Sequence, residues 1–178
     1  MIVRDTLVFR TLLAIARQRD DYDEPRSHAL LELLATADAV RADLRCRLHA
    51  IALSESQFAT LVVLRALDPE AVLPTTLAHH VGASRATMTA VLDHLLARVL
   101  IVRNRSHEDR RNYLITLTDA GRALADDAET ILLRGCAELS RALGGPAPRA
   151  LLALCEKLAP HTARVASADS ADSVTILP

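Results

Sequence analysis

Residues 73–100 read LPTTLAHHVGASRATMTAVLDHLLARVL, and much of the architecture of the chain follows from them. Two short segments with helical spacing of apolar residues flank Gly82, which tolerates the positive φ of a tight turn. Thr75 or Thr76 is expected to open the first helix, and Ser84 is a suitable N-cap for the second. The stretch therefore predicts a helix–turn–helix.

The second helix of this pair has two faces of different chemistry. Its apolar face is expected to be core and carries Met88, Val91, Leu92 and Leu95. Its opposite face holds short or cationic side chains and no acid: Ser84, Arg85, Thr87 and Thr89. Short side chains allow a helix to lie deep in the major groove of DNA, and an arginine can pair with both acceptors of guanine. We therefore predict that this face reads duplex DNA, with Thr75 and Thr76 of the preceding helix beside it.

Two strand-like runs, 100–105 and 112–117, follow this helix and are rich in β-branched residues. The polar segment SHEDRR joins them, so we expect a small hairpin, the wing of a winged helix. Between residues 84 and 111 six arginines face three acids, although the whole chain has a net charge of −1. A local basic segment is typical of a nucleic-acid-binding surface. The expected wing contacts are Arg103, Arg105, Arg110 and Arg111.

Helices are expected on both sides of this region. They cover about 2–19, 27–51, 54–67, 118–143 and 148–159, with Ser27 and Ser54 as N-caps and Gln57 completing a capping box. Apolar stripes over 30–51 and 124–143 would leave a single subunit poorly covered. We therefore expect a mostly α fold with a small β-hairpin wing and dimerisation helices at both ends. The expected regions are 1–52 (N-terminal dimerisation helices), 53–120 (winged helix–turn–helix), 121–160 (C-terminal dimerisation helices) and 161–178 (flexible tail).

The composition excludes several classes of protein. Of the 178 residues 51% are hydrophobic but only 2% aromatic, which favours a helical core of Leu, Ala and Val. The apolar runs are too short to span a bilayer and no signal peptide is visible, so we expect a cytoplasmic protein without a membrane partner. The chain shows no nucleophile elbow and no Gly-rich loop, so we expect no enzyme, catalytic residue or cofactor. The adjacent His79 and His80 point about 100° apart on a helix, which disfavours a metal site.

The three cysteines, Cys46, Cys136 and Cys155, have no CxxC spacing, so neither a disulfide framework nor a zinc site is indicated. We expect them to be small buried apolar residues. Cys46 leaves an alternative open, because it lies between Arg45 and Arg47, a setting in which reactive thiols occur.

Residues 53–67, LSESQFATLVVLRAL, and residues 77–124 together resemble the MarR family of winged helix–turn–helix transcriptional regulators. The resemblance runs over about residues 53–124, and its most specific pieces are DRR at 109–111 and LTDAG at 117–121, joined at the family's spacing. It implies a homodimeric, sequence-specific regulator, expected to be a repressor, on a pseudo-palindromic operator. Release would be controlled by a small-molecule effector, for which an aromatic acid is one class.

The family pattern also assigns roles within this region. Residues 84–97 would be the recognition helix and 100–117 the wing, in which Asp109 would brace Arg111 for the minor groove. Family members usually have Gly where this chain has Val99, so we expect this helix end to close without a left-handed residue, which β-branched side chains resist. Ala90 stands where an arginine is common, so one polar contact is missing.

A second hypothesis of a different class follows from these departures. The chain would then be a redox or ligand sensor, with Cys46 as its reactive thiol and with weak or lost DNA binding. Some longer family members that respond to urate draw a Trp from an extra N-terminal helix, but this chain has no Trp, so that ligand site is not carried over.

Overall fold

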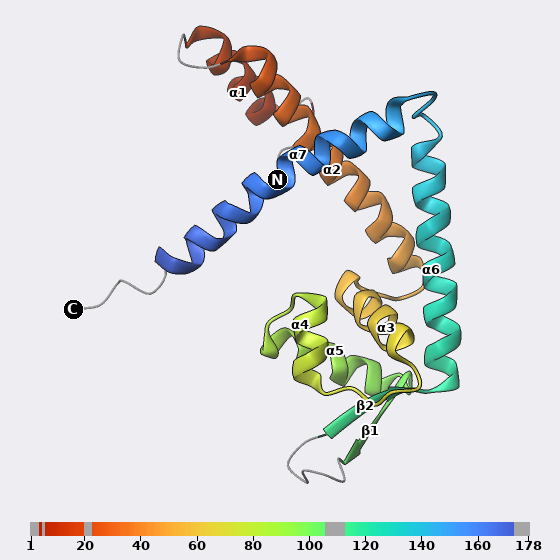
Figure 1. Cartoon of the computed structure of the whole chain (residues 1–178). Helices are drawn as coiled ribbons and strands as arrows, with labels where there is room; N and C mark the ends of the chain where they lie inside the picture. Colours follow the sequence, from red (N-terminus) through yellow and green to blue (C-terminus); the bar gives the residue numbers. More distant parts are fainter. Residues whose placement is uncertain (1–3, 5, 20–22, 106–112, 173–178) are drawn as a thin grey trace, which may run out of the picture. The chain divides into compact units, whose positions relative to one another are not determined.

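The computed structural model describes residues 4, 6–19, 23–105 and 113–172, which form seven helices and one antiparallel hairpin (Figure 1). In chain order these are α1 (Leu7–Gln18), α2 (Glu24–Ala50), α3 (Glu55–Leu67), α4 (Pro74–Val81), α5 (Arg85–Ala97), β1 (Ile101–Arg105), β2 (Tyr113–Leu117), α6 (Asp119–Ser140) and α7 (Ala147–Asp172). The chain divides into two compact units, Met1–Gly135 and Cys136–Pro178. The predicted class, mostly helical with a β-hairpin wing, is confirmed.

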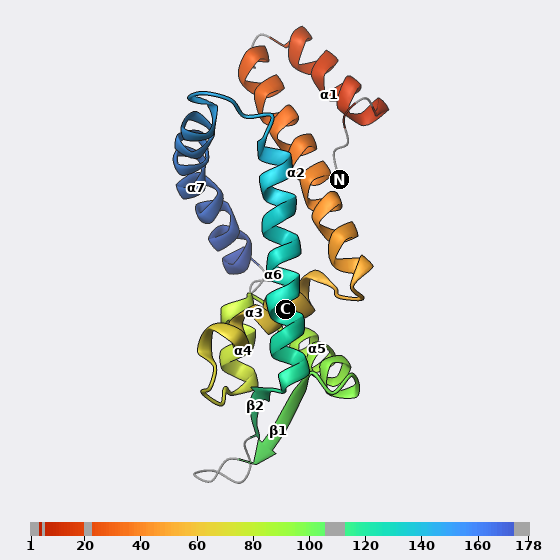
Figure 2. The same ribbon diagram turned by 90° about the vertical axis from the view of Figure 1, so that its right-hand side faces the viewer.

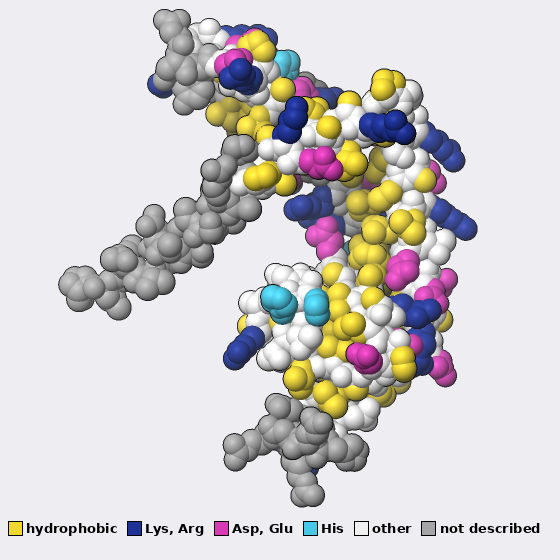
Figure 3. Space-filling view, in the orientation of Figure 1, with side chains coloured by type: hydrophobic (Ala, Val, Ile, Leu, Met, Phe, Trp, Pro, Cys, Tyr) yellow, Lys and Arg dark blue, Asp and Glu magenta, His cyan; other side chains and the backbone are white. Residues whose placement is uncertain are grey.

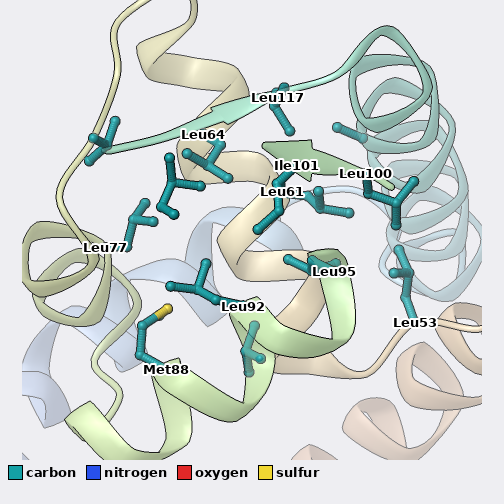
Figure 4. Close-up of a cluster of buried hydrophobic side chains, with 14 of the residues drawn as sticks. Leu53, Leu61, Leu64, Leu77, Met88, Leu92, Leu95, Leu100, Ile101 and Leu117 are labelled. Atoms are coloured by element: carbon teal, nitrogen blue, oxygen red, sulfur yellow. The ribbon is translucent and has the colours of Figure 1, made fainter. Parts of the chain in front are cut away.

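A single hydrophobic core joins α3, α4, α5 and the hairpin (Figure 4). Its largest fully buried apolar side chains are Leu61, Leu64, Leu77, Met88, Leu92, Leu95, Ile101 and Ile115. Burial of each such side chain stabilises the fold by about 1.5–3 kcal/mol relative to exposure. The apolar face predicted for the second helix of the pair is confirmed, because its four residues are at most 7% exposed. One face of α5 is therefore buried in this core, and its opposite face is exposed to solvent.

Side-chain caps begin several helices, two of them at the expected residues. Ser54 and Gln57 form the predicted capping box, with distances of 2.9 and 3.2 Å between backbone N and side-chain O. Ser84 accepts a hydrogen bond from the Thr87 amide at 3.1 Å, as predicted for α5. The expectation that Ser27 caps the second helix is wrong. Asp23 is the cap, because its carboxylate accepts from the Arg26 amide and Pro25 suits the first turn.

The expected start of α4 at Thr75 or Thr76 is also wrong. The helix begins one residue earlier, at Pro74, whose fixed φ suits the first helical turn, and its N-cap Leu73 makes no side-chain cap hydrogen bond.

Three helices end with a residue in the left-handed conformation: Ala52 (φ 55°) after α2, Gly82 (φ 68°) after α4 and Val99 (φ 56°) after α5. The next amide then bonds back to a carbonyl in the last turn, as in Leu100 N to Leu95 O at 3.0 Å. The expectation that Val99 would avoid this conformation is wrong. Leu95 and Leu100 are both buried in the core, and the left-handed turn at Val99 is what brings them there.

The hairpin pairs Ile101 with Leu117 and Arg105 with Tyr113, which leaves the predicted tip at 106–111 outside the described residues. Val72 adds a bridge that the sequence did not suggest, through two 2.9 Å hydrogen bonds with Ile115. This bridge ties the segment before α4 to the wing. The helix–turn–helix and the wing are therefore one hydrogen-bonded piece.

The start of α6 passes very close to the end of α5. A Cβ built on Gly121 would overlap the Leu100 carbonyl oxygen and lie 3.0 Å from its carbonyl carbon. The Thr118 hydroxyl lies 2.9 Å from the Val99 carbonyl oxygen, to which it donates, and accepts from the Gly121 amide at 3.0 Å. Only glycine permits this contact, which explains physically why LTDAG ends in Gly.

Figure 2 shows α1 beside the N-terminal part of α2. The helix expected over 2–19 is described from Leu7, since residues 1–3 and 5 lie outside the described part.

Within the described residues no single helix has the length and apolar composition to cross a membrane. Helices α2 and α3 meet that criterion only as a pair bent by 74°. In the second unit α7 continues to Asp172, past the expected end at 159, because the added stretch is rich in alanine.

Large apolar side chains remain exposed on several helices of this structure, and Figure 3 shows hydrophobic side chains at the helix surfaces. They include Leu7, Val8, Ile15, Leu30 and Leu34 on α1 and α2, Leu133 on α6, and Leu151, Leu152 and Leu154 on α7. The three cysteines are exposed as well, so the expectation that they are buried is wrong. They lie on faces of α2, α6 and α7 that the described residues do not cover.

Candidate nucleic-acid interface

The interface begins at the turn between α4 and α5. Gly82 is left-handed and its N–H bonds to the His79 carbonyl, which turns the chain sharply before Ser84 caps α5. The turn sets the first residues of α4 and α5 around a shared hollow of about 200 Å³. The hollow is lined by Pro74, Thr75, Arg85, Met88 and Thr89.

The N-termini of both helices lie at this hollow, and their charge favours the binding of an anion there. Neither α4 nor α5 has an acidic residue in its first turn. The first amides of a helix lack intrahelical acceptors, and the helix dipole adds partial positive charge there. At α4 no side-chain cap competes for these amides. With the exposed Arg85 nearby, the hollow offers amide donors and a guanidinium to a phosphate or a base edge.

The hydroxyls of α5 are partly committed to the helix itself. Ser84 Oγ and Thr87 Oγ1 lie 2.8 Å apart and share a hydrogen bond, and Ser84 Oγ also accepts from the Thr87 amide. Thr89 donates its hydroxyl proton to the Arg85 carbonyl at 3.0 Å. Thr89 can therefore offer a lone pair and a methyl group. The Arg85 side chain donates no hydrogen bond to any of the described residues.

The wing contributes exposed arginines on β1. The Arg103 guanidinium lies 5.0 Å from the centroid of the Tyr113 ring on β2, within the range of a cation–π contact. Arg105 is paired across the hairpin with Tyr113 and is exposed. Asp109, Arg110 and Arg111, the other predicted wing residues, lie outside the described residues.

The predicted site residues thus fall into groups. Thr75, Arg85 and Thr89 share the hollow, and Ser84 and Thr87 form the adjacent cap. Thr76 is half-buried and does not line the hollow. Cys46 lies apart from them, exposed on α2. Among the described residues no three His, Cys, Asp or Glu side chains are grouped so as to hold a metal ion.

Two ion pairs among the described residues link α6 to α3 and its C-cap residue, Asp68. Arg122 donates two hydrogen bonds to the Asp68 carboxylate, at 2.8 and 3.1 Å, and a third to Asp119. The hydrogen bonds from Arg122 lower the pKa of Asp68 below its ordinary value, and the same contact raises the pKa of Arg122. Arg65 donates to Asp126 at 2.8 Å, and this contact raises the pKa of Arg65.

Several residues that position the interface were not found from the sequence. Val72 pairs through its backbone with Ile115, which lies far along the chain, and no local pattern predicts that pairing. Thr118 and Gly121 belong to LTDAG, but the sequence did not predict that they contact the end of α5. The sequence identifies Arg98 only as one of the six arginines of the basic segment. Its side chain donates to the Ala52 carbonyl at the end of α2.

A helix–turn–helix whose second helix is capped and has no acid in its first turn, followed by a basic hairpin, defines the class of winged helix–turn–helix proteins. The chain has the arrangement of this class: α4 and α5 share one core with the hairpin β1–β2 (Figures 1 and 4).

Comparison with known proteins gives the family. The profile of the MarR family matches residues 53–113. The transcriptional repressor CouR, solved bound to a 23-mer DNA duplex, is 32% identical over 72% of this chain and 90% of its own, with a TM-score of 0.63. BpsR of Bordetella bronchiseptica, whose DNA binding is regulated by 6-hydroxynicotinic acid, is 25% identical over 71% of this chain and 89% of its own, with a TM-score of 0.60. Apo MarR of E. coli shares the fold at 20% identity, a TM-score of 0.60 and coverage of 71% and 93%.

The chain therefore belongs to the MarR family of transcriptional regulators. Members of this family regulate transcription and are not enzymes.

Proposed function

We propose that the chain is a homodimeric, sequence-specific DNA-binding regulator, acting as a repressor on a pseudo-palindromic operator. The observation that carries the proposal is the acid-free start of α5, where Arg85, Thr89 and Thr75 meet around one hollow beside two helix N-termini. The similarity to a repressor solved on DNA supports the same assignment.

In this proposal α5 enters the major groove and its exposed side reads base edges. Arg85 is the only long polar side chain among the four predicted readers, so it pairs with a guanine. The amides at the start of α4, with Thr75 and Thr76, hold a phosphate. Arg103 and Arg105, together with Arg110 and Arg111 at the tip, follow the backbone and the adjacent minor groove, with Asp109 bracing Arg111.

A two-fold symmetric dimer would bind an operator with matching two-fold sequence symmetry. Exposed apolar residues on α1, α2, α6 and α7 are those that a second subunit would cover. Two recognition helices related by a two-fold axis would read half-sites whose centres lie about 10 bp apart. Binding of a small-molecule effector, with aromatic acids as one class to test, would release the DNA. An operator-binding protein shares a compartment with DNA, so we place it in the cytoplasm.

Selection from a randomised duplex library tests the proposal. The wild type is expected to enrich one sequence with two-fold symmetry. On that duplex Arg85→Ala should weaken binding by about 1–3 kcal/mol and relax one base position per half-site. Arg10→Ala, which removes an exposed arginine from α1, serves as the matched control and should bind like the wild type. Enrichment of no sequence, or equal binding by Arg85→Ala, would contradict the assignment.

A redox sensor is the second candidate, favoured by the exposure of Cys46 between two arginines on α2. Arg47 donates to Asp43 at 2.7 Å, so one of those two charges is already engaged. Treatment with hydroperoxide followed by binding to the enriched duplex separates the candidates. Release of the wild type but not of Cys46→Ser would establish the sensor; the same response from both proteins would exclude Cys46.

A further inference from the structure

Arg98 occupies the C-cap of α5, immediately before the left-handed Val99. Its guanidinium Nη1 donates a hydrogen bond to the backbone carbonyl of Ala52, with an N–O distance of 2.6 Å. Ala52 is itself the left-handed residue that follows α2. The contact therefore joins the points at which the chain leaves α2 and leaves α5, 46 residues apart in sequence.

Apolar side chains in the described part of the chain also connect these two helix ends. Leu48 and Leu53 at the end of α2 share a core with Leu95 and Leu100 at the end of α5 (Figure 4 labels the last three). The hydrophobic effect is non-directional, so it constrains the relative rotation of the two ends less strictly than a directional contact does. A short hydrogen bond from a charged donor is directional and adds that constraint.

A small rotation of α5 about its C-terminal end displaces the side chains at its N-terminal end. The helix has 13 residues, and at about 1.5 Å per residue Arg85 lies about 20 Å along the axis from Arg98. A rotation of about 5° then moves the first turn by more than 1 Å, which is enough to spoil a hydrogen bond that needs about 2.7–3.2 Å between heavy atoms. Base readout by Arg85 and Thr89 therefore depends on how the far end of the helix is held.

We propose that Arg98 is a positioning residue that fixes the angle of the recognition helix relative to α2, and so sets the spacing at which two subunits read their half-sites. The inference rests on the proposed function, in which α2 belongs to the dimer interface and α5 reads the DNA. Arg98 acts through the Ala52 carbonyl and not by touching a base.

The test uses the full-length protein and three duplexes. These are the duplex enriched by the wild type, the same duplex with one base pair inserted between its half-sites, and a scrambled duplex of equal composition. The variants are Arg98→Ala and Arg98→Lys, which keeps an ammonium donor, with Arg10→Ala as the control. Affinity is measured over a range of salt concentrations, and thermal unfolding at one protein concentration checks the fold.

Arg98→Ala is expected to lose about tenfold in affinity for the enriched duplex, because a charge-assisted hydrogen bond is lost from each subunit. It should bind the scrambled duplex like the wild type and keep the salt slope. It should also discriminate less between the two spacings, since the recognition helices are held less firmly. Arg98→Lys should recover most of the affinity.

Several results would overturn the inference. One is an Arg98→Ala protein with the spacing discrimination of the wild type. Another is an equal loss on the enriched and scrambled duplexes with a shallower salt slope, because Arg98 would then contact a phosphate directly. If the wild type enriches no duplex, the proposed function fails and this inference falls with it. Should Arg98→Ala not fold, Arg98→Gln, which keeps part of the side-chain stem, replaces it with the same expected results.

Discussion

Thr89 lies on the exposed side of α5, and its hydroxyl proton is already donated to the Arg85 carbonyl. A threonine in this state reaches a base edge with a lone pair or with its methyl group. The methyl group fits the thymine C5 methyl, and the lone pair fits an amino group of adenine or cytosine. Because the hydroxyl serves the helix backbone, we expect the methyl group to make the contact.

Two substitutions at this position separate the two kinds of contact. Thr89→Val keeps the methyl group in place and removes the oxygen, whereas Thr89→Ser does the reverse. We predict that Thr89→Val binds the enriched duplex like the wild type and that Thr89→Ser loses about 0.8 kcal/mol per contact, close to the value of one buried CH₂. Fluorescence anisotropy measures both affinities. The opposite order of the two variants would show that the oxygen is the reader.

Val99 holds a conformation that its branched side chain disfavours. The left-handed region costs a non-glycine residue about 1–2 kcal/mol. Glycine avoids this cost, but it lowers the free energy of unfolding by about 0.4–1 kcal/mol because it raises the conformational entropy of the unfolded chain. Val99 is 65% exposed, so its side chain contributes little packing. Val99→Gly should therefore raise the free energy of unfolding by about 0.5–1 kcal/mol. Chemical denaturation at one protein concentration measures it. Ala52→Gly, at a left-handed residue without β-branching, should gain less, and a destabilised Val99→Gly would refute the explanation.

Among the elements, the contact of α6 with the end of α5 leaves no space for a side chain. Alanine in place of glycine ordinarily stabilises a helix by about 1 kcal/mol. At Gly121 the added Cβ would overlap the Leu100 carbonyl, so we predict that Gly121→Ala destabilises the protein by about 3 kcal/mol. Thermal unfolding measures the change. Gly144→Ala is the matched control, since nothing lies within 4 Å of its Cβ and it should be neutral. A tolerated Gly121→Ala would mean that α6 does not approach α5 this closely.

The ion pair of Asp68 with Arg122 links α6 to the end of α3, and Asp68 is only 16% exposed. Since the folded-state pKa of Asp68 is lowered, the pair stabilises the fold above the unfolded pKa of about 4, and this contribution is lost as the pH falls through the folded value. We predict that Asp68→Asn lowers the free energy of unfolding at pH 7 and that its difference from the wild type shrinks below about pH 4. Denaturation at several pH values measures this, with the fully exposed Asp119→Asn as a control expected to change less. A difference that does not vary with pH would exclude the pair as its source.

Over the whole molecule, the features that sequence could predict are local. The caps Ser54 and Ser84, the turn at Gly82 and the existence of the hairpin depend on residues a few positions apart, and all were predicted. The register of the hairpin was not. The left-handed Val99 was not, because the buried positions of Leu95 and Leu100 override the local preference of valine. The same limit applies to the hollow shared by Thr75, Arg85 and Thr89, which exists only once α4 and α5 are packed. The predicted readers are exposed, and which bases they contact depends on the DNA itself.

The central claim is that α5 reads the major groove in two half-sites, and interference by dimethyl sulfate tests it most directly. The reagent methylates guanine N7 in the major groove and adenine N3 in the minor groove. On the enriched duplex we predict that methylated guanines block binding in two clusters about 10 bp apart, and that Arg85→Ala loses interference at one guanine in each. Interference at adenine N3 alone, or the same guanine pattern for Arg85→Ala, would contradict the account.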